Sequence, residues 1–545
     1  MQPAQQNIVQ MAVDAIARYG NNKAYCCMGV SLSFRELGVL SDNFAHWLVN
    51  QAGVQPGDRV AVMLPNVLQY PVVALGVLKA QGVVVNINPL YTPHELQRIL
   101  IDSGAGTLVV FANVAHNAAA ILGHTSVRTV VLTQVGDLLG WCRGSLINLL
   151  VRHVRRLVKP HQFPRAAIGL RQALRSGGVL VRMRGTLATG FSPDALAVLQ
   201  YTGGTTGVMK AAMLSHSNLL SNVEQIVTSM QDDFPGPGAV MVAPLPLYHI
   251  YAFNLNFVMS LLRGHRALLI PNPRDIPAFV SALRKVKIQG FVGINTLYNN
   301  LLDNPAFREL DFTTLEIAAS GGMPLSPQVA SRWHALTGKP ILEGYGLTEC
   351  SPMVSCNTHH GYRAGTVGRV AAGTEVCLFD QEGKEVGCGE LGEICVRGPQ
   401  VMQAYWNNDA ETRHVIDAQG WLHTGDIGRF DKDGYLRIVD RLKDMIVISG
   451  FNVYPNEIED YACRHPDIRD ACAIGIGSEL VPVIKLYVVS RNPDLTAEQV
   501  IAHCRLGLTA YKLPRQVEFR TELPKSSVGK VLRRELRDAA MAADR

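Results

Sequence analysis

The sequence predicts an α/β protein made of several units, with sheets covered by helices. Between residues 58 and 110, short apolar segments rich in Val, Ile and Leu alternate with segments of helical pattern, as they do in such folds. The chain has 545 residues, too many for one hydrophobic core, so we expect roughly two to four units. It is 48% hydrophobic and 18% charged, which supplies a sizeable core and excludes wholesale disorder.

Strands and helices alternate in the first part of the chain. We expect strands at residues 59–64, 83–87 and 107–111, separated by helices at 69–79 and 93–100. The apolar stretch 71–87 contains Lys79 and Gln81, so it predicts a helix and a strand rather than a membrane span. Further strands are expected at 239–242, 267–270 and 290–293.

The pattern changes after Gly373, where short strands at 376–379 and 392–397 flank a turn at 380–383. We interpret residues 365–440 as a β-subdomain. Past Asp440, a helix beginning at Pro455 and a strand at 485–489 predict a compact tail. The expected division is therefore an N-terminal domain, residues 1–440, and a C-terminal domain, residues 441–545.

Charge and cysteine content narrow the class of protein. The net charge is +6, and no Lys/Arg run is interleaved with aromatic residues, so we expect no nucleic-acid partner. The eleven cysteines are scattered without a CxxC pair, and residues 1–4 do not begin a signal peptide. We therefore expect reduced thiols and a cytoplasmic protein.

A basic insertion, residues 137–190, stands apart from the rest. Apolar residues around Trp141 and Leu146 precede its arginines. Its basic residues are Arg143, Arg152, Arg155, Arg156, Lys159, Arg165, Arg171, Arg175, Arg182 and Arg184. Two interpretations stay open: a basic amphipathic surface that contacts the inner face of the cytoplasmic membrane through anionic lipid, or an ordinary solvated insertion.

The most informative motif is residues 202–210 (TGGTTGVMK), which follows an apolar strand at 196–199. Glycines let backbone N–H groups crowd around a phosphate, threonine hydroxyls add donors, and Lys210 adds a cation. The loop is not a Walker A motif, because Val-Met-Lys follows Gly207. The alternative is a turn that is rich in small residues and binds nothing.

Four further motifs suit a nucleotide. A strand at 340–342 ends in residues 343–349 (EGYGLTE), where Tyr345 offers a flat face and Glu349 a hard oxygen ligand for Mg²⁺. In residues 420–426 (GWLHTGD), Asp426 follows a tight glycine turn and can accept hydrogen bonds from a ribose diol. The others are residues 439–444 (VDRLKD) and 524–530 (PKSSVGK). Each alone can be structural, but five in this order are hard to obtain by chance.

Together these motifs resemble the adenylate-forming superfamily of acyl-CoA synthetases, luciferases and peptide-synthetase adenylation domains, from about Tyr19 to Leu536. Residues 65–71, 88–93, 244–250, 272–275 and 449–459 make the chain most similar to bacterial long-chain fatty acid–CoA ligases. The resemblance implies a large N-terminal domain of two α/β sheets plus the β-subdomain, and a small, mobile α+β C-terminal domain.

The resemblance also implies a reaction in two halves, with fatty acid, ATP and CoA as substrates and Mg²⁺ as cofactor. A carboxylate attacks the α-phosphate of ATP to give an acyl-adenylate and pyrophosphate, and a thiol then displaces AMP. Adenylation is needed because AMP is a far better leaving group than hydroxide. A homodimer is a further expectation from the resemblance, with no surface named.

The resemblance assigns most candidate residues to the nucleotide. Those expected around the β- and γ-phosphates are Thr202, Gly203, Gly204, Thr205, Thr206, Gly207 and Lys210. Tyr345 and the turn containing Gly322 and Met323 are expected to enclose adenine, with Glu343 and Gly344 in the same site. Asp426 and Arg441 are expected to hold the ribose.

The remaining residues are assigned to the reaction. Thr348 is expected at the α-phosphate, Glu349 at Mg²⁺, and Lys530 where charge develops between the α-phosphate and the carboxylate. Lys443 is the expected hinge of the C-terminal domain. His249 is expected to line the carboxylate site, and a packed structural histidine is its alternative.

The chain departs from the family pattern at three places. Ala211 replaces the usual Gly after Lys210, and Ala404 replaces the Gly that usually precedes Tyr-Trp. Residues 475–484 suggest a loop shorter than usual, with Glu479 displaced, near the thiol path. Adenylation is therefore the more secure expectation of the two half-reactions.

Three alternatives to a long-chain fatty acid–CoA ligase remain open. One is a fatty acyl-AMP ligase that loads a carrier protein, and another is a medium-chain or aryl acid–CoA ligase. The third is a binding protein that has lost turnover, against which the intact Thr348, Glu349 and Lys530 argue.

Overall fold

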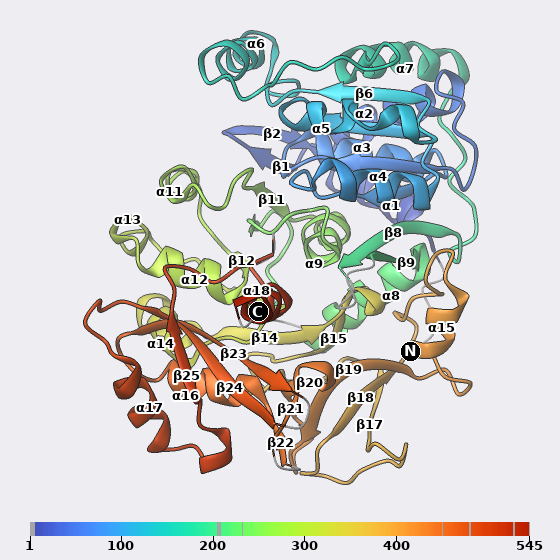
Figure 1. Ribbon diagram of the computed structural model, residues 1–545. Coiled ribbons are helices and arrows are strands. Elements are labelled where there is room, and N and C mark those ends of the chain that lie inside the picture. The colour runs from blue at the N-terminus through green and yellow to red at the C-terminus, as the bar shows by residue number, and fades with distance from the viewer. Residues whose placement is uncertain are drawn as a thin grey trace.

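The computed structural model describes residues 6–203, 209–230, 233–448, 451–478, 481–526 and 529–543. Two large sheets with helices packed on them form most of the chain, and three smaller sheets follow, which confirms the predicted α/β class (Figure 1).

The first large sheet has seven strands. In spatial order they are β7 (Ile168–Gly169), β6 (Thr129–Thr133), β5 (Thr107–Phe111), β3 (Arg59–Met63), β4 (Val83–Asn86), β8 (Leu196–Gly203) and β9 (Met209–Ser215). All neighbours are parallel except β8 and β9, which form a hairpin. Helices α2 (Phe34–Asn50), α3 (Gln69–Lys79), α4 (Pro93–Ser103) and α5 (Ala115–Ala119) accompany the sheet.

Strand β3 illustrates how the sheet is buried on both faces. Val60 and Val62 belong to the core shared by the two large sheets, whereas Ala61 and Met63 belong to a second core that includes α4. Successive side chains of a strand point to opposite faces, so a strand buried on both sides is apolar throughout. The continuous apolar run at 59–64 has this cause.

The second large sheet has nine strands. In spatial order they are β16 (Arg369–Val370), β15 (Met353–Cys356), β14 (Ile341–Gly346), β13 (Ile317–Gly321), β12 (Gly290–Gly293), β10 (Val240–Ala243), β11 (Arg266–Leu269), β1 (Lys23–Cys27) and β2 (Val30–Ser33). Its helices are α1 (Ile8–Tyr19), α8 (His216–Met230), α9 (Ile250–Ala252), α10 (Met259–Arg263), α11 (Ile276–Leu283), α12 (Asn295–Leu302), α13 (Pro305–Arg308) and α14 (Pro327–Thr337). Trp333 of α14 is fully buried, with its ring centre 4.8 Å from that of Tyr298 on α12.

A four-stranded antiparallel sheet follows, consisting of β17 (Glu375–Phe379), β18 (Gly392–Arg397), β19 (Leu422–Phe430) and β20 (Leu436–Arg441), with α15 (Asp409–Val415) between β18 and β19. The expected strands and the turn after Asp380 are confirmed.

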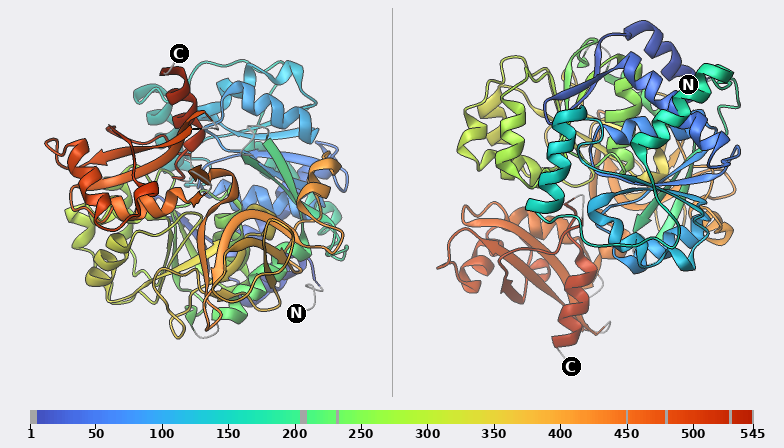
Figure 2. Two further views of the ribbon diagram at one scale, coloured as in Figure 1. Left: turned by 60° about the horizontal axis from the view of Figure 1, so that its bottom comes forward. Right: turned by 90° about the horizontal axis from the view of Figure 1, so that it is seen from above.

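The tail contains two small sheets. One pairs β21 (Ile446–Ile448) with β22 (Phe451–Val453), and the other contains β23 (Ile468–Ser478), β24 (Val481–Ser490) and β25 (Gln516–Phe519). Helices α16 (Pro455–Ala462), α17 (Ala497–Arg505) and α18 (Arg533–Ala543) pack on them, and two small cores belong to the tail alone. From above, the tail lies to one side of the rest (Figure 2). The domain boundary after residue 440 stays a prediction.

The basic insertion is only partly separate, which corrects its description as a segment that stands apart. Its second half forms β7 and helix α7 (Leu170–Arg184), and α7 packs on α2 so closely that a Cβ on Gly177 would lie 1.7 Å from the Asn43 carbonyl oxygen. Its first half, α6 (Trp141–Leu149) and the π-helical turn η3 (Leu150–Val154), lies at the surface (Figure 1).

The expected loop at 475–484 is also wrong for most of its length. Gly475 pairs with Ile484, and Ser478 pairs with Val481, so β23 and β24 continue nearly to the turn. Glu479 lies outside the described residues. Among the helices that the structure describes, none is long and apolar enough to cross a membrane.

Candidate active site

The phosphate motif lies on the β8–β9 hairpin. Strand β8 continues through Tyr201, Thr202 and Gly203, where a loop was expected, and Thr202 pairs with Lys210 across the hairpin. Gly204, Thr205, Thr206 and Gly207 lie outside the described residues. The motif is therefore held between two paired strands, so that its ends are fixed.

Lys210 points to side chains that lie far away in the sequence. Its ammonium pairs with Glu411 of α15 and lies 5.6 Å from the ring centre of Tyr405. The Tyr405 hydroxyl donates a hydrogen bond of 2.6 Å to Glu349 Oε1. Burial and the nearby Glu349 raise the pKa of Tyr405, so its hydroxyl stays a donor. One ring thus links the hairpin to the expected Mg²⁺ ligand.

Tyr405 is a site residue that sequence reasoning missed. The tripeptide at 404–406 attracted attention only because Ala404 replaces a glycine. The available signal was the Tyr-Trp pair itself, with its phenol and indole donors.

Strand β14 carries the adenine motif. The strand runs from Ile341 to Gly346. The sequence predicts that Glu343, Gly344 and Tyr345 follow the end of the strand, but they lie inside it. Gly344 pairs with Gly321 of β13 and with Cys356 of β15. This pairing places Tyr345 next to the turn containing Gly322, whose φ of 79° favours glycine, and Met323.

A short 3₁₀ helix, Thr348–Cys350, follows the strand and carries Thr348 and Glu349. Just before this helix, the backbone of Gly346 packs closely against that of Pro352. A Cβ on Gly346 would lie 1.9 Å from the Pro352 carbonyl oxygen, so there is no room for a side chain at this position.

Asp426 lies in the middle of β19, which corrects the expectation that it follows a tight turn. Gly425, with a φ of 69°, kinks the strand just before it. The Asp426 carboxylate is buried and accepts a 2.7 Å hydrogen bond from the Tyr345 hydroxyl on Oδ2. Its Oδ1 lies 3.0 Å from Arg441 Nε, its cross-strand neighbour on β20. The residues expected around adenine and ribose therefore converge.

Glu343 lies beside the same turn and accepts a 3.4 Å hydrogen bond from the Leu325 backbone N–H. Burial, and more weakly the charge of Asp460 on α16, raise the pKa of Glu343 to about 7. A half-protonated carboxyl at neutral pH can both donate and accept hydrogen bonds.

Lys530 lies on a tight loop between residues 525 and 531, where Ser526 N donates to the Lys530 carbonyl at 2.8 Å. The loop rests on the N-terminal end of α12: a Cβ on Gly529 would lie 2.6 Å from Thr296 Oγ1. Part of the Lys530 surface reaches solvent, while protein atoms crowd its ammonium on the other sides. This desolvation lowers the pKa of Lys530 to about 8, and the charge of Arg441 acts in the same direction.

The surroundings of Lys530 join the tail to the rest of the site. Asp426 and Glu349 stabilise its charge, and its charge in turn disfavours protonation of His249. Burial is the larger cause that lowers the pKa of His249 to about 4. His249 is therefore neutral at pH 7, and its Nδ1 accepts from Tyr251 N at 3.3 Å, where it caps α9.

Lys443 lies in a short 3₁₀ turn, Leu442–Asp444, between two charged residues that both form ion pairs. On one side Arg441 pairs with Asp426, and on the other Asp444 pairs with Arg537 and, at 3.6 Å, with Arg533 of α18. The Arg441–Asp426 pair belongs to the four-stranded sheet, whereas Asp444 pairs with arginines of the tail.

The family model of the AMP-binding enzyme matches residues 13–406, and the model of the AMP-binding enzyme C-terminal domain matches residues 457–530. A long-chain-fatty-acid–CoA ligase of Escherichia coli O157:H7 is 48% identical over 538 residues, which are 98% of this chain and 95% of that protein. A protein of the same name from Haemophilus influenzae is 43% identical over 542 residues, 98% of this chain and 95% of that one.

Solved structures agree in fold. ATP-bound MatB from Rhodopseudomonas palustris has a TM-score of 0.82 at 27% identity, over 98% of this chain and 99% of that one. The anthranilate CoA ligase AuaEII with anthranoyl-AMP has a TM-score of 0.86 at 24% identity, over 100% and 99% of the two chains. The matched residues and the identity across nearly the whole chain establish that this protein belongs to the AMP-binding enzyme family.

Proposed function

We propose that the protein is an ATP-dependent fatty acid–CoA ligase with a preference for long chains, acting through an acyl-adenylate and releasing AMP and pyrophosphate. The observation that carries this proposal is that Lys530, a tail residue, lies near enough to Asp426 and Glu349 of the main body for their charges to act on its ammonium. The relatives at 43–48% identity, named long-chain-fatty-acid–CoA ligases, support the substrate class.

The nucleotide would bind along the line from Tyr345 to Lys210. Adenine would lie against Tyr345 and the turn at Gly322 and Met323. The ribose hydroxyls would donate to Asp426, whose Oδ2 is occupied by the Tyr345 hydroxyl and would exchange that partner for the sugar. Thr202 and Lys210 would hold the β- and γ-phosphates, since the ammonium can exchange Glu411 for a phosphate.

The residues present fit a magnesium ion bound with ATP. Glu349 uses Oε1 for the Tyr405 hydroxyl, which leaves Oε2 for a cation, and carboxylate oxygens are ligands that Mg²⁺ prefers. When bound, the ion would neutralise phosphate charge. Tyr405 would orient the Glu349 carboxylate, and Thr348, in the same 3₁₀ helix, would face the α-phosphate.

Lys530 would stabilise the first transition state. When the fatty acid carboxylate attacks the α-phosphate, negative charge builds up on the phosphate oxygens, and a cation already in place lowers the barrier. His249 is neutral, so it would line the carboxylate site without adding charge.

The second half-reaction would require the tail to move about Lys443. The Asp426–Arg441 and Asp444–Arg537 pairs lie on either side of the hinge, so a rotation at Lys443 can keep both. It would break the hydrogen bond from Asn456 N of α16 to Asp440 Oδ2, 2.8 Å long, and the contact of Gly529 with Thr296. Lys530 would then leave the site and open it to the thiol of CoA.

The substrate class is tested by pyrophosphate release from ATP with fatty acids of graded length. We expect release that depends on fatty acid and increases toward long chains, with thioester formed only when CoA is added. Thioester with a purified acyl carrier protein but not with CoA would favour the carrier-loading ligase. A preference for medium-chain or aryl acids would favour the other alternative, and release with none of these acids would contradict the proposal.

The role of Lys530 is tested by replacing Lys530 with Ala. Loss of the preorganised charge is expected to slow acyl-adenylate formation about 10²–10³-fold, while CoA transfer from synthetic acyl-AMP is retained. Lys525→Ala, on the same loop but paired with Asp470, is the matched control and should change neither step by more than a few-fold. Equal loss of both half-reactions in Lys530→Ala would contradict the role.

The lowered pKa of Lys530 predicts the pH dependence of adenylation. Its charged form is lost as the pH rises through about 8, so kcat/KM for ATP should fall above that pH. Bound phosphates hold the proton, so kcat should fall only at higher pH. Lys443 also has its pKa lowered to about 8, by burial, but Arg at 530 stays charged. A fall that persists in Lys530→Arg would therefore assign it to another group.

We also propose that helix α6 contacts anionic membrane lipid on the inner face of the cytoplasmic membrane. The apolar side chains of α6 and of the segment that follows it form an exposed group, the α6 patch, which is 42–83% exposed and consists of Trp141, Leu146, Leu149, Leu150, Val154 and Leu157. Arg152, Arg155, Arg156 and Lys159 surround it and are all exposed. Apolar residues among cations suit the boundary between acyl chains and anionic headgroups. The homodimer implied by the resemblance stays a prediction.

Flotation with phosphatidylglycerol liposomes tests the membrane contact. Each arginine near an anionic surface contributes about 1 kcal/mol, so neutralising Arg152, Arg155 and Arg156 should weaken binding about 100-fold at low salt. The control neutralises Arg18, Arg308 and Arg505, which are equally exposed but scattered. Equal binding of both variants would contradict the proposed surface and leave the solvated insertion.

A further inference from the structure

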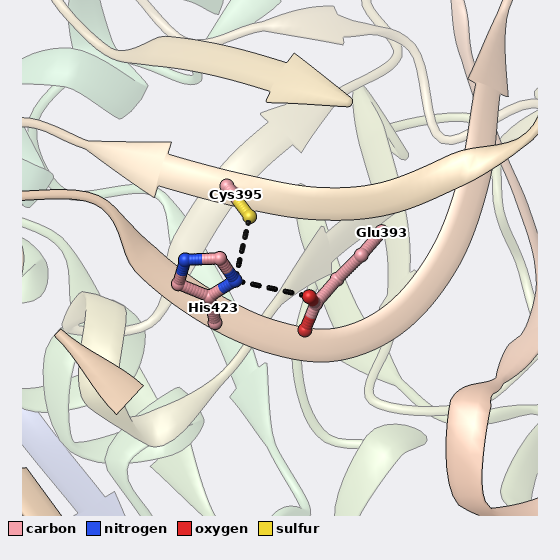
Figure 3. A group of neighbouring side chains, drawn as sticks. All are labelled: Glu393, Cys395 and His423. Atoms are coloured by element: carbon pink, nitrogen blue, oxygen red, sulfur yellow. Dashed lines mark hydrogen bonds and ion pairs between the residues drawn. The ribbon is translucent and has the colours of Figure 1, made fainter. Parts of the chain in front are cut away.

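A second polar cluster lies on the four-stranded sheet, outside the groups that the proposed reaction uses. Cys395 of β18 and His423 of β19 are direct cross-strand partners, and Glu393 lies two residues before Cys395 on the same strand (Figure 3). Residues opposite one another, or two apart on one strand, share a face of a sheet. The three side chains therefore meet where β18 pairs with β19, at a shift of the register between Glu393 and Cys395.

Their ligand atoms converge on a single point. His423 Nδ1 lies 3.3 Å from Cys395 Sγ and 3.0 Å from Glu393 Oε2, and all three atoms lie within 4.8 Å of one another (Figure 3). A tetrahedral zinc ion bound to sulfur, nitrogen and oxygen separates such atoms by roughly 3.3–3.6 Å. The two pairs that include His423 Nδ1 are within a few tenths of an ångström of these separations, and the thiol sulfur and the carboxylate oxygen lie no more than 4.8 Å apart.

His423 Nδ1 cannot satisfy Glu393 and the Cys395 thiol together by hydrogen bonding alone. A ring nitrogen either carries one proton or has one lone pair, so Nδ1 cannot donate to Glu393 and accept from the Cys395 thiol at the same time. If it donates to Glu393, the buried thiol has no acceptor in the ring. A cation at the centre would satisfy the sulfur, the nitrogen and the oxygen together.

Further contacts hold the ligands in place. The other ring nitrogen, His423 Nε2, lies 3.5 Å from Asp417 Oδ2, which is the arrangement that orients metal-binding histidines. Glu393 Oε1 accepts from Gly425 N at 2.9 Å, which leaves Oε2 facing His423. The His423 side chain is 32% exposed, so an ion can enter from solvent.

We propose that Glu393, Cys395 and His423 bind a zinc ion, with a water molecule as fourth ligand. One thiolate, one imidazole and one carboxylate are ligands that zinc accepts together. The ion would have a structural role. It would clamp β18 to β19 directly beneath Gly425, the residue before Asp426, and so would stiffen the strand that holds the ribose carboxylate. The proposal is independent of the acyl substrate.

Cobalt(II) titration of the full-length, chelator-treated protein tests the site. Wild type should take up one tightly bound Co²⁺ with a thiolate-to-cobalt charge-transfer band, and zinc should displace it. The band should be absent in Cys395→Ser and His423→Gln. Asp417→Asn should weaken Co²⁺ binding about 10–100-fold, since Asp417 acts through the ring.

The matched control is Cys377→Ser. Cys377 is the cross-strand partner of Cys395 on β17, but its thiol is not among the three converging atoms. This variant should keep the band, and zinc should raise its apparent melting temperature as it does for wild type but not for His423→Gln. A wild type without the band, a band retained in His423→Gln, or a band lost in Cys377→Ser would each overturn the assignment.

Discussion

The buried carboxylate of Asp426 is the constraint on which the geometry of the site depends. Its two oxygens hold Tyr345, on the nine-stranded sheet, and Arg441, at the end of the four-stranded sheet. A buried charge is tolerated only when it is paired and hydrogen-bonded, so each of these contacts offsets part of the cost of burying the carboxylate. One side chain therefore joins the nine-stranded sheet to the last strand of the four-stranded sheet.

The proposed hinge, Lys443, lies only two residues after Arg441 and is therefore close to the same carboxylate. If Arg441 moved with the tail, Asp426 would lose its ion pair. If Asp444 did not move with the tail, it would lose its ion pair with Arg537. In the proposed rotation, the torsions between these two pairs would absorb the change. Desolvation by nearby protein atoms and the charge of Arg441 lower the pKa of Lys443 to about 8.

Regular elements could be predicted from the sequence, whereas their junctions at the site could not. Helix α3 and strands β5, β12 and β18 have the predicted bounds because their apolar runs are clearly delimited in the sequence. The sequence predicts loops at the glycine-rich ends of β8 and β14, because glycine has a low strand propensity. In the structure, pairing with β9, β13 and β15 keeps these ends extended. The link from Tyr405 to Glu349 spans 56 residues and has no local signal at all.

The departure at Ala211 can now be interpreted physically. Ala211 pairs with Tyr201 in the β8–β9 hairpin, and its buried methyl group packs in the core that includes α4. Its backbone is not left-handed, so a side chain is tolerated without strain, and its carbonyl accepts a 2.8 Å hydrogen bond from Trp406 N. The residue before Trp406, Tyr405, forms an isolated bridge with Ala212 and donates a hydrogen bond to Glu349. The segment that hydrogen-bonds to the end of the hairpin therefore also carries the partner of the Glu349 carboxylate, the proposed cation ligand.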